Sequence, residues 1–578
     1  MSQSSPDTGL AELKSVRGES RGLYWFVGIF GFFVNLLMLT GPLYMLNVYD
    51  RVLGSRSLET LIALSVLVAF LYGMMGLLDY SRGRIMARVG ARFQSKLDRR
   101  VFSAVLRASA MPRPPKQAAT GLKDLESVQR LITSPVLMAF FDMPWTPLFF
   151  FGIFLFHPGL GLLAVAGGTA LIIAALLNQR TSREPLKSAN AALHRAELLG
   201  AEIRTESEMI QSLGMRRSSF GRWKQARDES LDATISAADG SGTWTSLIKA
   251  FRLLLQSAML GLGAYFVLQN ELTPGAMIAG SILLGRALAP VELIVNQWAV
   301  VQRGREGWDN LAILLSEIAP EQPKTALPRP RAILEAQQVT VVPPGDQQAA
   351  LRMVSFRVEP GQAVGVIGPS GAGKSTLAKT IIGIWRPAGG KIRLDGAALD
   401  QYDPDVLGQH IGYLPQRVQL FEGTIRDNIA RMSPEPDDAA VIEAAKAAAA
   451  HEMILKLPDG YDTQVSMTGG RLSGGQVQRI GLARAMYGDP VVLVLDEPNS
   501  NLDNQGSEAL NEAIRRFKRQ DRIVMIMAHR PAAIQECDLL LMIDGGMRKA
   551  FGPRDEVLRE MVKNYDAIAQ ASGKGGVT

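Results

Sequence analysis

The chain has 578 residues, too many for a single hydrophobic core, so two or more domains are expected. Hydrophobic residues make up 47% of the chain and are concentrated in its first half, which argues against an entirely soluble protein. The net charge of +7 fits either a nucleic-acid partner or the basic cytoplasmic segments of a membrane protein. The single cysteine, Cys537, excludes an intrachain disulfide and is most simply a small apolar core residue.

The first half of the chain contains apolar runs of the length that a membrane-spanning helix needs. Residues 1–20 are polar and are expected to form a flexible segment. A hydrocarbon core of about 30 Å is crossed by a helix of about 20 apolar residues. Six such runs follow, at 23–46, 60–78, 135–156, 160–177, 253–268 and 277–298. The sequence therefore predicts a membrane domain at 21–317 with six transmembrane helices.

The basic residues between these runs predict the orientation of the chain in the membrane. The stretches 80–134 and 178–245 contain twelve and ten Lys or Arg residues, whereas the links 47–57, 157–159 and 269–275 contain two, none and none. Positively charged segments stay on the cytoplasmic side, so both termini and both long connections should be cytoplasmic. Their Ala-, Leu-, Glu- and Arg-rich composition favours helical extensions of the spans over separate soluble domains.

Three ionisable residues, Arg252, Arg286 and Glu292, lie in or beside the last two spans. An ionisable group in lipid is costly and usually faces a cavity or a partner. Arg286 and Glu292 are six residues apart, so they cannot pair well along one helix face. Either the sixth span lines a water-filled pathway, or these side chains reach the membrane surface.

A proline-rich stretch separates the membrane domain from the rest of the chain. Four prolines fall between residues 318 and 330, and we expect a linker at 318–331. From residue 332 onward, strand-like and helix-like runs alternate, which predicts an α/β domain at 332–565, followed by a flexible tail at 566–578.

The α/β domain contains a glycine-rich loop between a predicted strand at 363–367 and a predicted helix at 376–382. The loop reads G-x-x-x-x-G-K-S and consists of Gly368, Pro369, Ser370, Gly371, Ala372, Gly373, Lys374 and Ser375, with Thr376 opening the helix. Glycines let backbone N–H groups surround phosphate oxygens, and the helix N-terminus adds partial positive charge. Lys374 is expected to reach the β- and γ-phosphates of ATP, and the Ser375 hydroxyl to bind Mg²⁺.

Two further stretches of this domain carry chemistry. A predicted buried strand ends in Asp496 and Glu497, whose side chains should diverge because a strand alternates its two faces. Asp496 suits Mg²⁺, and Glu497 suits the general base that polarises an attacking water. The motif Leu472-Ser473-Gly474-Gly475-Gln476 precedes a predicted helix and forms a second anion site, although one nucleotide site needs only one phosphate cradle.

The LSGGQ motif, the phosphate loop and the Asp-Glu strand together resemble the ATPase domain of the ABC transporter family. In that family, the LSGGQ motif of one copy covers the nucleotide bound by the phosphate loop of the other copy. This chain has one of each motif and one set of six spans. The resemblance therefore implies a half-transporter that acts as a homodimer, in which Ser473, Gly474, Gly475 and Gln476 contact the partner's ATP.

The resemblance also implies roles for three more residues. Gln416 matches the glutamine that contacts Mg²⁺ and water, Asp503 matches an aspartate that acts across the dimer, and His529 matches the histidine that contacts the γ-phosphate. One family feature is missing, because no aromatic residue lies near Pro343, where the family usually stacks one on adenine. Adenine is expected to rest instead on apolar side chains or on Pro343.

Three stretches, at 141–147, 285–292 and 496–503, resemble one branch of exporters, the permease/ATPases of bacterial type I secretion systems (PrtD-like protease and lipase exporters). The stretch 208–215 resembles the coupling helix that docks on the partner's ATPase domain. This resemblance implies ATP-driven export of an unfolded polypeptide, such as a protease or lipase with a C-terminal signal, across the bacterial inner membrane. The implied partners are a periplasmic adaptor (membrane fusion protein), an outer-membrane duct, the secreted polypeptide and the lipid bilayer, but no nucleic acid.

Two alternatives share the ATP motifs. An exporter of lipids or small amphiphiles has the same architecture, and only its transported substrate distinguishes it. A soluble ABC-type ATPase acting on nucleic acid or ribosomes fits the basic net charge, but the six apolar spans argue against it.

Overall fold

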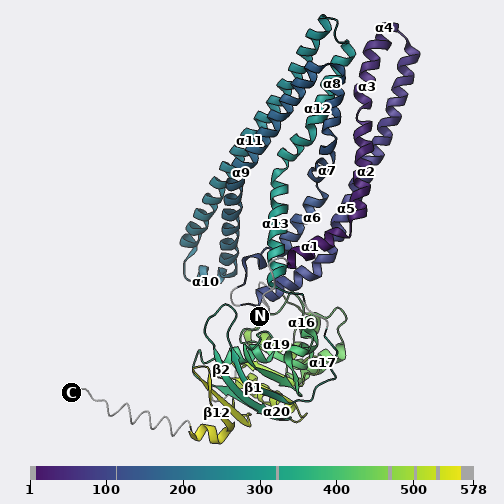
Figure 1. Ribbon diagram of the computed structural model, residues 1–578. Coiled ribbons are helices and arrows are strands. Elements are labelled where there is room, and N and C mark those ends of the chain that lie inside the picture. The colour runs from purple at the N-terminus through teal and green to yellow at the C-terminus, as the bar shows by residue number, and fades with distance from the viewer. Residues whose placement is uncertain are drawn as a thin grey trace, which may run out of the picture. The chain divides into compact units, whose positions relative to one another are not determined.

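The computed structural model describes residues 8–111, 114–320, 324–465, 472–499, 504–528 and 534–560 (Figure 1). The chain divides into two units. The first contains residues up to Pro320, except for the segment Ala110–Pro114, which groups with the second unit from Glu321 onward. The first unit is all helical and the second is a mixed α/β domain, as the sequence predicts.

Long helices build the first unit. They are α1 (Thr8–Gly18), α2 (Arg21–Leu37), α3 (Thr40–Asn47), η1 (Val48–Val52), α4 (Leu53–Ser55), α5 (Leu58–Ser109), η2 (Lys116–Ala118), α6 (Gly121–Thr133), α7 (Pro135–Asp142), η3 (Met143–Trp145), α8 (Thr146–Phe156), α9 (Pro158–Thr205), α10 (Ser207–Ser212), α11 (Arg216–Leu268), α12 (Pro274–Asn296) and α13 (Trp298–Glu317). Among the described residues, six helical segments are long and apolar enough to cross a membrane. The prediction of six spans is therefore confirmed.

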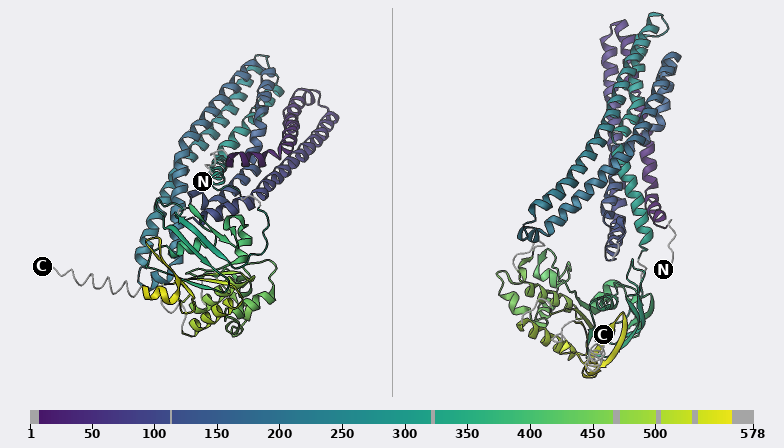
Figure 2. Two further views of the ribbon diagram at one scale, coloured as in Figure 1. Left: turned by 60° about the horizontal axis from the view of Figure 1, so that its bottom comes forward. Right: turned by 90° about the vertical axis from the view of Figure 1, so that its left-hand side faces the viewer.

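The basic connections continue the spans as helices. The helices α5, α9 and α11 each exceed 45 residues, far beyond the length that crosses a bilayer. The helices α9 and α11 lie side by side along their length (Figures 1 and 2). The interpretation of the long connections as helical extensions is thus confirmed, with one difference: the first extension breaks after Ser109 and resumes as α6.

The expectation of a flexible segment at 1–20 is wrong for the described part of it. Helix α1 packs on α13, with Leu13 fully buried and the Gly9 amide donating a hydrogen bond to Ser316 Oγ at 2.9 Å. Glu12 pairs with Arg100 of α5 at 3.1 Å. The polar composition misled the prediction because the apolar contacts that order this helix come from distant parts of the chain.

The charged residues of the last two spans are arranged in a way that the sequence did not reveal. Glu292 of α12 pairs with Arg252 of the neighbouring helix α11 at 3.1 Å, and both side chains are about three-quarters buried. Arg286 lies exposed on α12. Glu292 therefore pairs with a residue of the neighbouring helix. The sequence spacing could exclude a pair between Glu292 and Arg286, but it could not identify Arg252 as the partner.

A second ionic cluster is buried between α2, α5 and α7. Arg82 is 1% exposed and donates a hydrogen bond through Nη2 to Asp142 Oδ1 at 2.8 Å. Asn35 donates to the same oxygen at 2.9 Å and to the Gly31 carbonyl at 2.8 Å. The cluster ties three helices together through one carboxylate.

Within its described residues, the second unit contains three sheets and their covering helices. Its strands are β1 (Leu334–Val341), β2 (Leu351–Val358), β3 (Ala363–Ile367), β4 (Gly389–Leu394), β5 (Ala397–Ala398), β6 (Ile411–Leu414), β7 (Gly423–Thr424), β8 (Gln464–Val465), β9 (Val492–Asp496), β10 (Ile523–Met527), β11 (Leu539–Asp544) and β12 (Met547–Pro553). Its helices are α14 (Lys374–Ile381), η4 (Leu399–Gln401), α15 (Pro404–His410), α16 (Ile425–Ile429), α17 (Asp438–Ala447), α18 (His451–Leu455), η5 (Gly460–Asp462), α19 (Gly474–Met486) and α20 (Asn504–Lys518).

The main sheet positions the nucleotide motifs. Its strand order is β12-β11-β3-β10-β9-β6, and β3 pairs in parallel with both β10 and β11. The strands β3, β9 and β10 consist almost entirely of buried apolar residues, as expected for strands covered on both faces. In such a sheet, ligands bind outside the carboxyl ends of the strands, and both the glycine loop and Asp496 lie at those ends.

Candidate functional site

The loop between β3 and α14 has the backbone shape of a phosphate cradle. Gly368, Gly371 and Gly373 have φ values of 153°, 77° and 104°, which favour glycine. A Cβ on Gly368 would lie 2.0 Å from the Ile543 carbonyl oxygen, and one on Gly373 would lie 2.8 Å from the Ala350 carbonyl oxygen. Only glycine fits at either position, so the sequence pattern follows from close backbone approach.

Lys374 opens α14 and folds over this loop. Its Nζ donates hydrogen bonds to the carbonyl oxygens of Gly368 and Pro369 at 2.8 and 2.9 Å. Burial lowers the pKa of Lys374, while Glu497 and Asp496 act in the opposite direction. The ammonium group thus lies at the centre of the loop, where phosphate oxygens offer it stronger, charge-assisted hydrogen bonds than these carbonyls.

Asp496 ends β9 next to Ser375. The side chain is 4% exposed, and Ser375 Oγ donates to its Oδ1 at 3.5 Å. Burial raises the pKa of Asp496, the neighbouring Glu497 adds to this, and the Ser375 hydrogen bond opposes it. A divalent cation would compensate this buried charge, and Mg²⁺ typically takes one or two carboxylates together with phosphate oxygens and waters. The residues present therefore fit Mg²⁺, although the described residues contain no cluster of three His, Cys, Asp or Glu side chains.

Glu497 leaves the strand by a backbone turn. Its φ is 50°, in the left-handed region, and its amide donates to the Met527 carbonyl oxygen at 3.0 Å. The sequence argument placed Asp496 and Glu497 on opposite faces of one strand, but β9 ends at Asp496. The divergence of the two side chains therefore comes from this turn, a conformation that costs about 1–2 kcal/mol for a residue other than glycine.

Gln416 lies beside Glu497. Gln416 follows β6, the neighbour of β9, and its Nε2 donates to Glu497 Oε2 at 3.0 Å. The structure thus brings together residues that lie about 130 positions apart: the phosphate loop, Gln416, Asp496 and Glu497. Their common location agrees with the grouping expected from the sequence, while their individual roles remain a prediction.

The LSGGQ motif forms the capped N-terminus of α19. Ser473 Oγ accepts a hydrogen bond from the Gln476 amide at 3.3 Å, and Gln476 Oε1 accepts one from the Ser473 amide at 2.8 Å. Among the described residues, no hydrogen bond joins Ser473, Gly474, Gly475 or Gln476 to the phosphate loop of the same chain. The motif is therefore a pre-formed, capped helix N-terminus that forms no hydrogen bond with the described residues of its own phosphate loop.

One residue of α19 was missed by the sequence reasoning. Gln478 is 3% exposed, and its Nε2 donates a hydrogen bond to the Pro498 carbonyl oxygen. It fastens the LSGGQ helix to the segment that follows Glu497. Its signal in the sequence is a polar side chain on the otherwise apolar face of α19. The predicted residues Asp503 and His529 lie outside the described residues.

The expected adenine position lies in the loop between β1 and β2. Pro343 is buried in that loop, and its carbonyl oxygen accepts a hydrogen bond from the Asp346 amide at 3.0 Å. The end of the loop, at Ala350 and Leu351, approaches Gly373 of the cradle. The loop without an aromatic residue therefore borders the phosphate site, and what contacts adenine stays a prediction.

The phosphate cradle, the buried carboxylate at its side and the capped LSGGQ helix define an ABC-type ATPase, which this chain joins to six helices able to span a membrane. Two family models match the chain: "ABC transporter" over residues 351–500 and "ABC transporter transmembrane region" over residues 24–289. The chain belongs to the ABC transporter family, in the branch of the type I secretion permease/ATPases. It is therefore an ATP-binding and ATP-hydrolysing membrane transporter.

Several proteins are similar over most of their length. The type I secretion system ATP-binding protein PrsD of Rhizobium meliloti (strain 1021) is 41% identical over 94% of both chains. The cyclolysin secretion/processing ATP-binding protein CyaB of Bordetella pertussis (strain Tohama I) is 29% identical over 91% of this chain and 74% of its own. A bacterial Atm1-family ABC exporter solved with ATP bound is 23% identical, covers 96% of this chain and 99% of its own, and superposes with a TM-score of 0.77, which supports the fold.

Proposed function

We propose that the protein is the ATP-driven membrane component of a type I secretion system and exports unfolded polypeptides, such as proteases or lipases with a C-terminal signal. The observation that carries this proposal is the presence in one chain of the phosphate cradle and six apolar helices, together with 41% identity to a type I secretion ATP-binding protein. Relatives named for toxin translocation or cyclolysin secretion support a polypeptide as the substrate.

The proposed working unit is a homodimer with two composite ATP sites. In each site, Lys374 and the backbone of Gly368–Ser375 hold the phosphates of one ATP, and the partner copy's LSGGQ helix covers it. The described geometry supports this arrangement because the helix N-terminus at Ser473 is free of hydrogen bonds to its own cradle. The N-terminus of a helix attracts anionic oxygens through its backbone N–H groups and its partial positive charge.

The hydrolytic step is assigned to residues at the carboxyl end of β9. Glu497 accepts a proton from the attacking water, and Gln416, which donates to Glu497 at 3.0 Å, orients that carboxylate and the water. Ser375 and Asp496 would hold Mg²⁺, which supplies positive charge that stabilises the transferring phosphate. Thr376, Asp503 and His529 complete the proposed nucleotide contacts.

The proposed location is the bacterial inner membrane, with residues 332–565 as the cytoplasmic ATPase domain after a linker at 318–331 and before a tail at 566–578. The basic helical extensions support a cytoplasmic location for the long connections. A periplasmic adaptor and an outer-membrane duct would complete the route for the polypeptide. The lipid or amphiphile exporter remains the second candidate, since it shares all ATP-site geometry.

A reconstitution experiment tests the proposal. Cells that carry the chain with its adaptor and duct are assayed for release of a polypeptide into the medium, and purified proteoliposomes are assayed for ATPase stimulation by that polypeptide's C-terminal segment and by lipid. We expect export from the wild type and none from Glu497→Gln, with the exposed Glu556→Gln as the matched control. Stimulation by lipid alone, without polypeptide release, would contradict the secretion function.

A further inference from the structure

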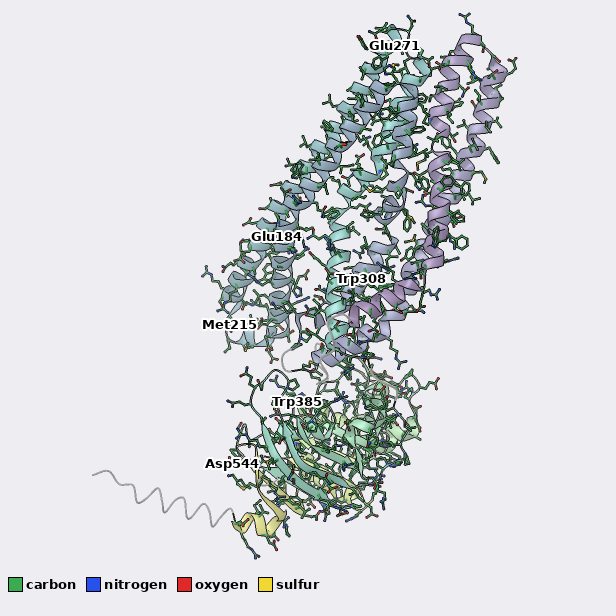
Figure 3. All side chains as sticks on the ribbon, in the orientation of Figure 1. Glu184, Met215, Glu271, Trp308, Trp385 and Asp544 are labelled. Carbon is green, nitrogen blue, oxygen red and sulfur yellow. The ribbon has the colours of Figure 1, made fainter. Side chains whose placement is uncertain are left out.

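A cavity of about 670 Å³ lies between α9, α10 and α11, at the end of the α9–α11 hairpin where the chain reverses direction. Figure 3 shows Met215 at this end of α11 and Glu271 beyond the opposite end. The volume is within the range of about 300–1,000 Å³ that is typical of ligand-binding pockets. The cavity is distant in sequence from every residue of the nucleotide site.

Apolar side chains form much of the cavity wall. They are Ile203 of α9, Ile210 of α10, and Phe220 and Trp223 of α11. The rings of Phe220 and Trp223 lie 6.1 Å apart, and Phe220 is 58% exposed. A Cβ on Gly200 would lie 3.3 Å from Trp223 Nε1, so this glycine makes room for the indole ring. Aromatic rings held open to water at a helix end suit an apolar ligand.

Three arginines surround these apolar residues. Arg204, Arg216 and Arg227 line the cavity together with one carboxylate, Glu197. Within the described part of the chain, none of the three guanidinium groups forms an ion pair, and only that of Arg216 forms a hydrogen bond, with Gln211 Oε1 at 3.5 Å. Three positive groups and one negative group leave an excess of two positive charges. The planar guanidinium group is well suited to bind carboxylates through paired hydrogen bonds.

The position of the cavity along α9 shows whether a lipid headgroup could be its anionic ligand. Ile203 lies 26 residues beyond Leu177, the end of the fourth apolar run, on the same continuous helix. At 1.5 Å per residue, this distance is about 39 Å along the helix axis. A lipid headgroup attracts charges over a Debye length of about 8 Å at physiological salt, so the bilayer surface is out of reach. The position of the cavity therefore excludes a lipid headgroup as its ligand.

We propose that this cavity binds a short segment of the exported polypeptide in which apolar side chains are combined with carboxylates. This inference rests on the polypeptide-export function proposed above and adds a recognition site to it. An unfolded cargo exposes apolar side chains, which match the Phe220 and Trp223 surface, and its acidic groups match the unpaired arginines. A nucleotide or free phosphate would satisfy the arginines but would leave the apolar wall without a partner.

The test measures peptide binding to the detergent-solubilised full chain by fluorescence anisotropy. The probe is a labelled 15-residue peptide of Leu, Phe, Ser and Glu, and its companion has Gln in place of every Glu. The variant is Arg204→Gln/Arg227→Gln, and the control is Arg217→Gln/Arg222→Gln, two exposed arginines of α11 outside the cavity lining. We expect the Kd of the acidic peptide to rise at least tenfold in the variant, to change less than twofold in the control, and to rise also in Trp223→Ala.

Other outcomes overturn the inference. An unchanged Kd in both cavity variants would place peptide binding elsewhere, and competition by inorganic phosphate or ATP instead of peptide would identify the cavity as a small-anion site. A change of oligomeric state in the variants, measured by light scattering, without any peptide binding to the wild type would make the cavity a contact between two copies. If the wild type exports polypeptide while the variant binds it normally, only the inference fails; if the wild type exports none, the proposed function fails as well.

Discussion

Neutralising Asp142 should destabilise the membrane unit by an amount that the buried cluster around Arg82 allows us to work out. Asp142→Asn keeps the size of the side chain and an acceptor oxygen for both Arg82 Nη2 and Asn35 Nδ2, which now lie 2.8 and 2.9 Å from Asp142 Oδ1. The substitution therefore removes the negative charge and little else. Arg82, at 1% exposure, would then carry an uncompensated buried charge.

Breaking a buried ion pair by removing one partner costs about 3–5 kcal/mol. Arg82 has a second carboxylate neighbour, Asp79, at 3.5 Å, but the Asp79 side chain is 68% exposed. Such an exposed pair contributes at most about 1 kcal/mol because water screens it. Since an acceptor also remains at position 142, we expect a loss near the lower end, about 3 kcal/mol. Asp142→Ala should cost about 1–3 kcal/mol more, because it also removes the acceptor of Arg82 Nη2 and leaves Asn35 Nδ2 with only the Gly31 carbonyl oxygen.

The assay is thermal unfolding of the full chain in detergent, followed by tryptophan fluorescence. At about 2 °C per kcal/mol for a unit of this size, Asp142→Asn should lower the Tm of the membrane unit by about 6 °C. The matched control, Asp79→Asn, should lower it by no more than about 2 °C. The double variant Arg82→Met/Asp142→Leu should regain most of the loss, since an apolar replacement of a whole pair is often neutral. An Asp142→Asn protein with the Tm of the wild type would refute the assignment of an uncompensated buried charge.

Four other predictions concern the second unit. Glu497→Gln should bind ATP normally and lower its hydrolysis by about 10²–10⁴-fold, the usual contribution of a general base; turnover near that of the wild type would exclude Glu497 from that role. Lys374→Ala should weaken ATP binding in a filter or fluorescence assay, because its ammonium group lies at the centre of the loop, and an unchanged Kd would contradict this placement. Burial raises the pKa of the Cys537 thiol to about 12, so maleimide should label it only after unfolding, and rapid labelling of the folded chain would be inconsistent with its 3% exposure. Burial, with a smaller effect of Arg329, lowers the pKa of His410 from its ordinary value of 6.5. The folded domain therefore keeps its full stability above pH 6.5 and loses some of it as the pH falls below that value, because folding opposes protonation of His410. His410→Asn should flatten the decline in Tm between pH 7.5 and 5.5, and an unchanged decline would argue against this role of His410.

The sequence predicted the features that depend on neighbouring residues. The glycine loop could be predicted because an unusual φ or a close backbone approach requires glycine at single positions, as at Gly368 and Gly373. The six spans could be predicted because a helix that crosses the lipid bilayer needs an uninterrupted run of apolar residues. The grouping of Gln416, Asp496 and Glu497 also followed from the sequence, but through resemblance to a family rather than through local chemistry.

The tertiary structure decided the features that join distant segments. Helix α1 is ordered by Arg100 and Ser316, which the polar composition of the first residues does not reveal. Glu292 pairs with Arg252 across two helices, and Arg82 is compensated by a carboxylate 60 positions away. A charged or polar side chain is stable in a buried position only where it meets a partner, and for Arg82 and Glu292 that partner lies on another helix. The sequence therefore determined which chemical groups the chain carries, and the packing of its helices and strands determined which of these groups contact one another.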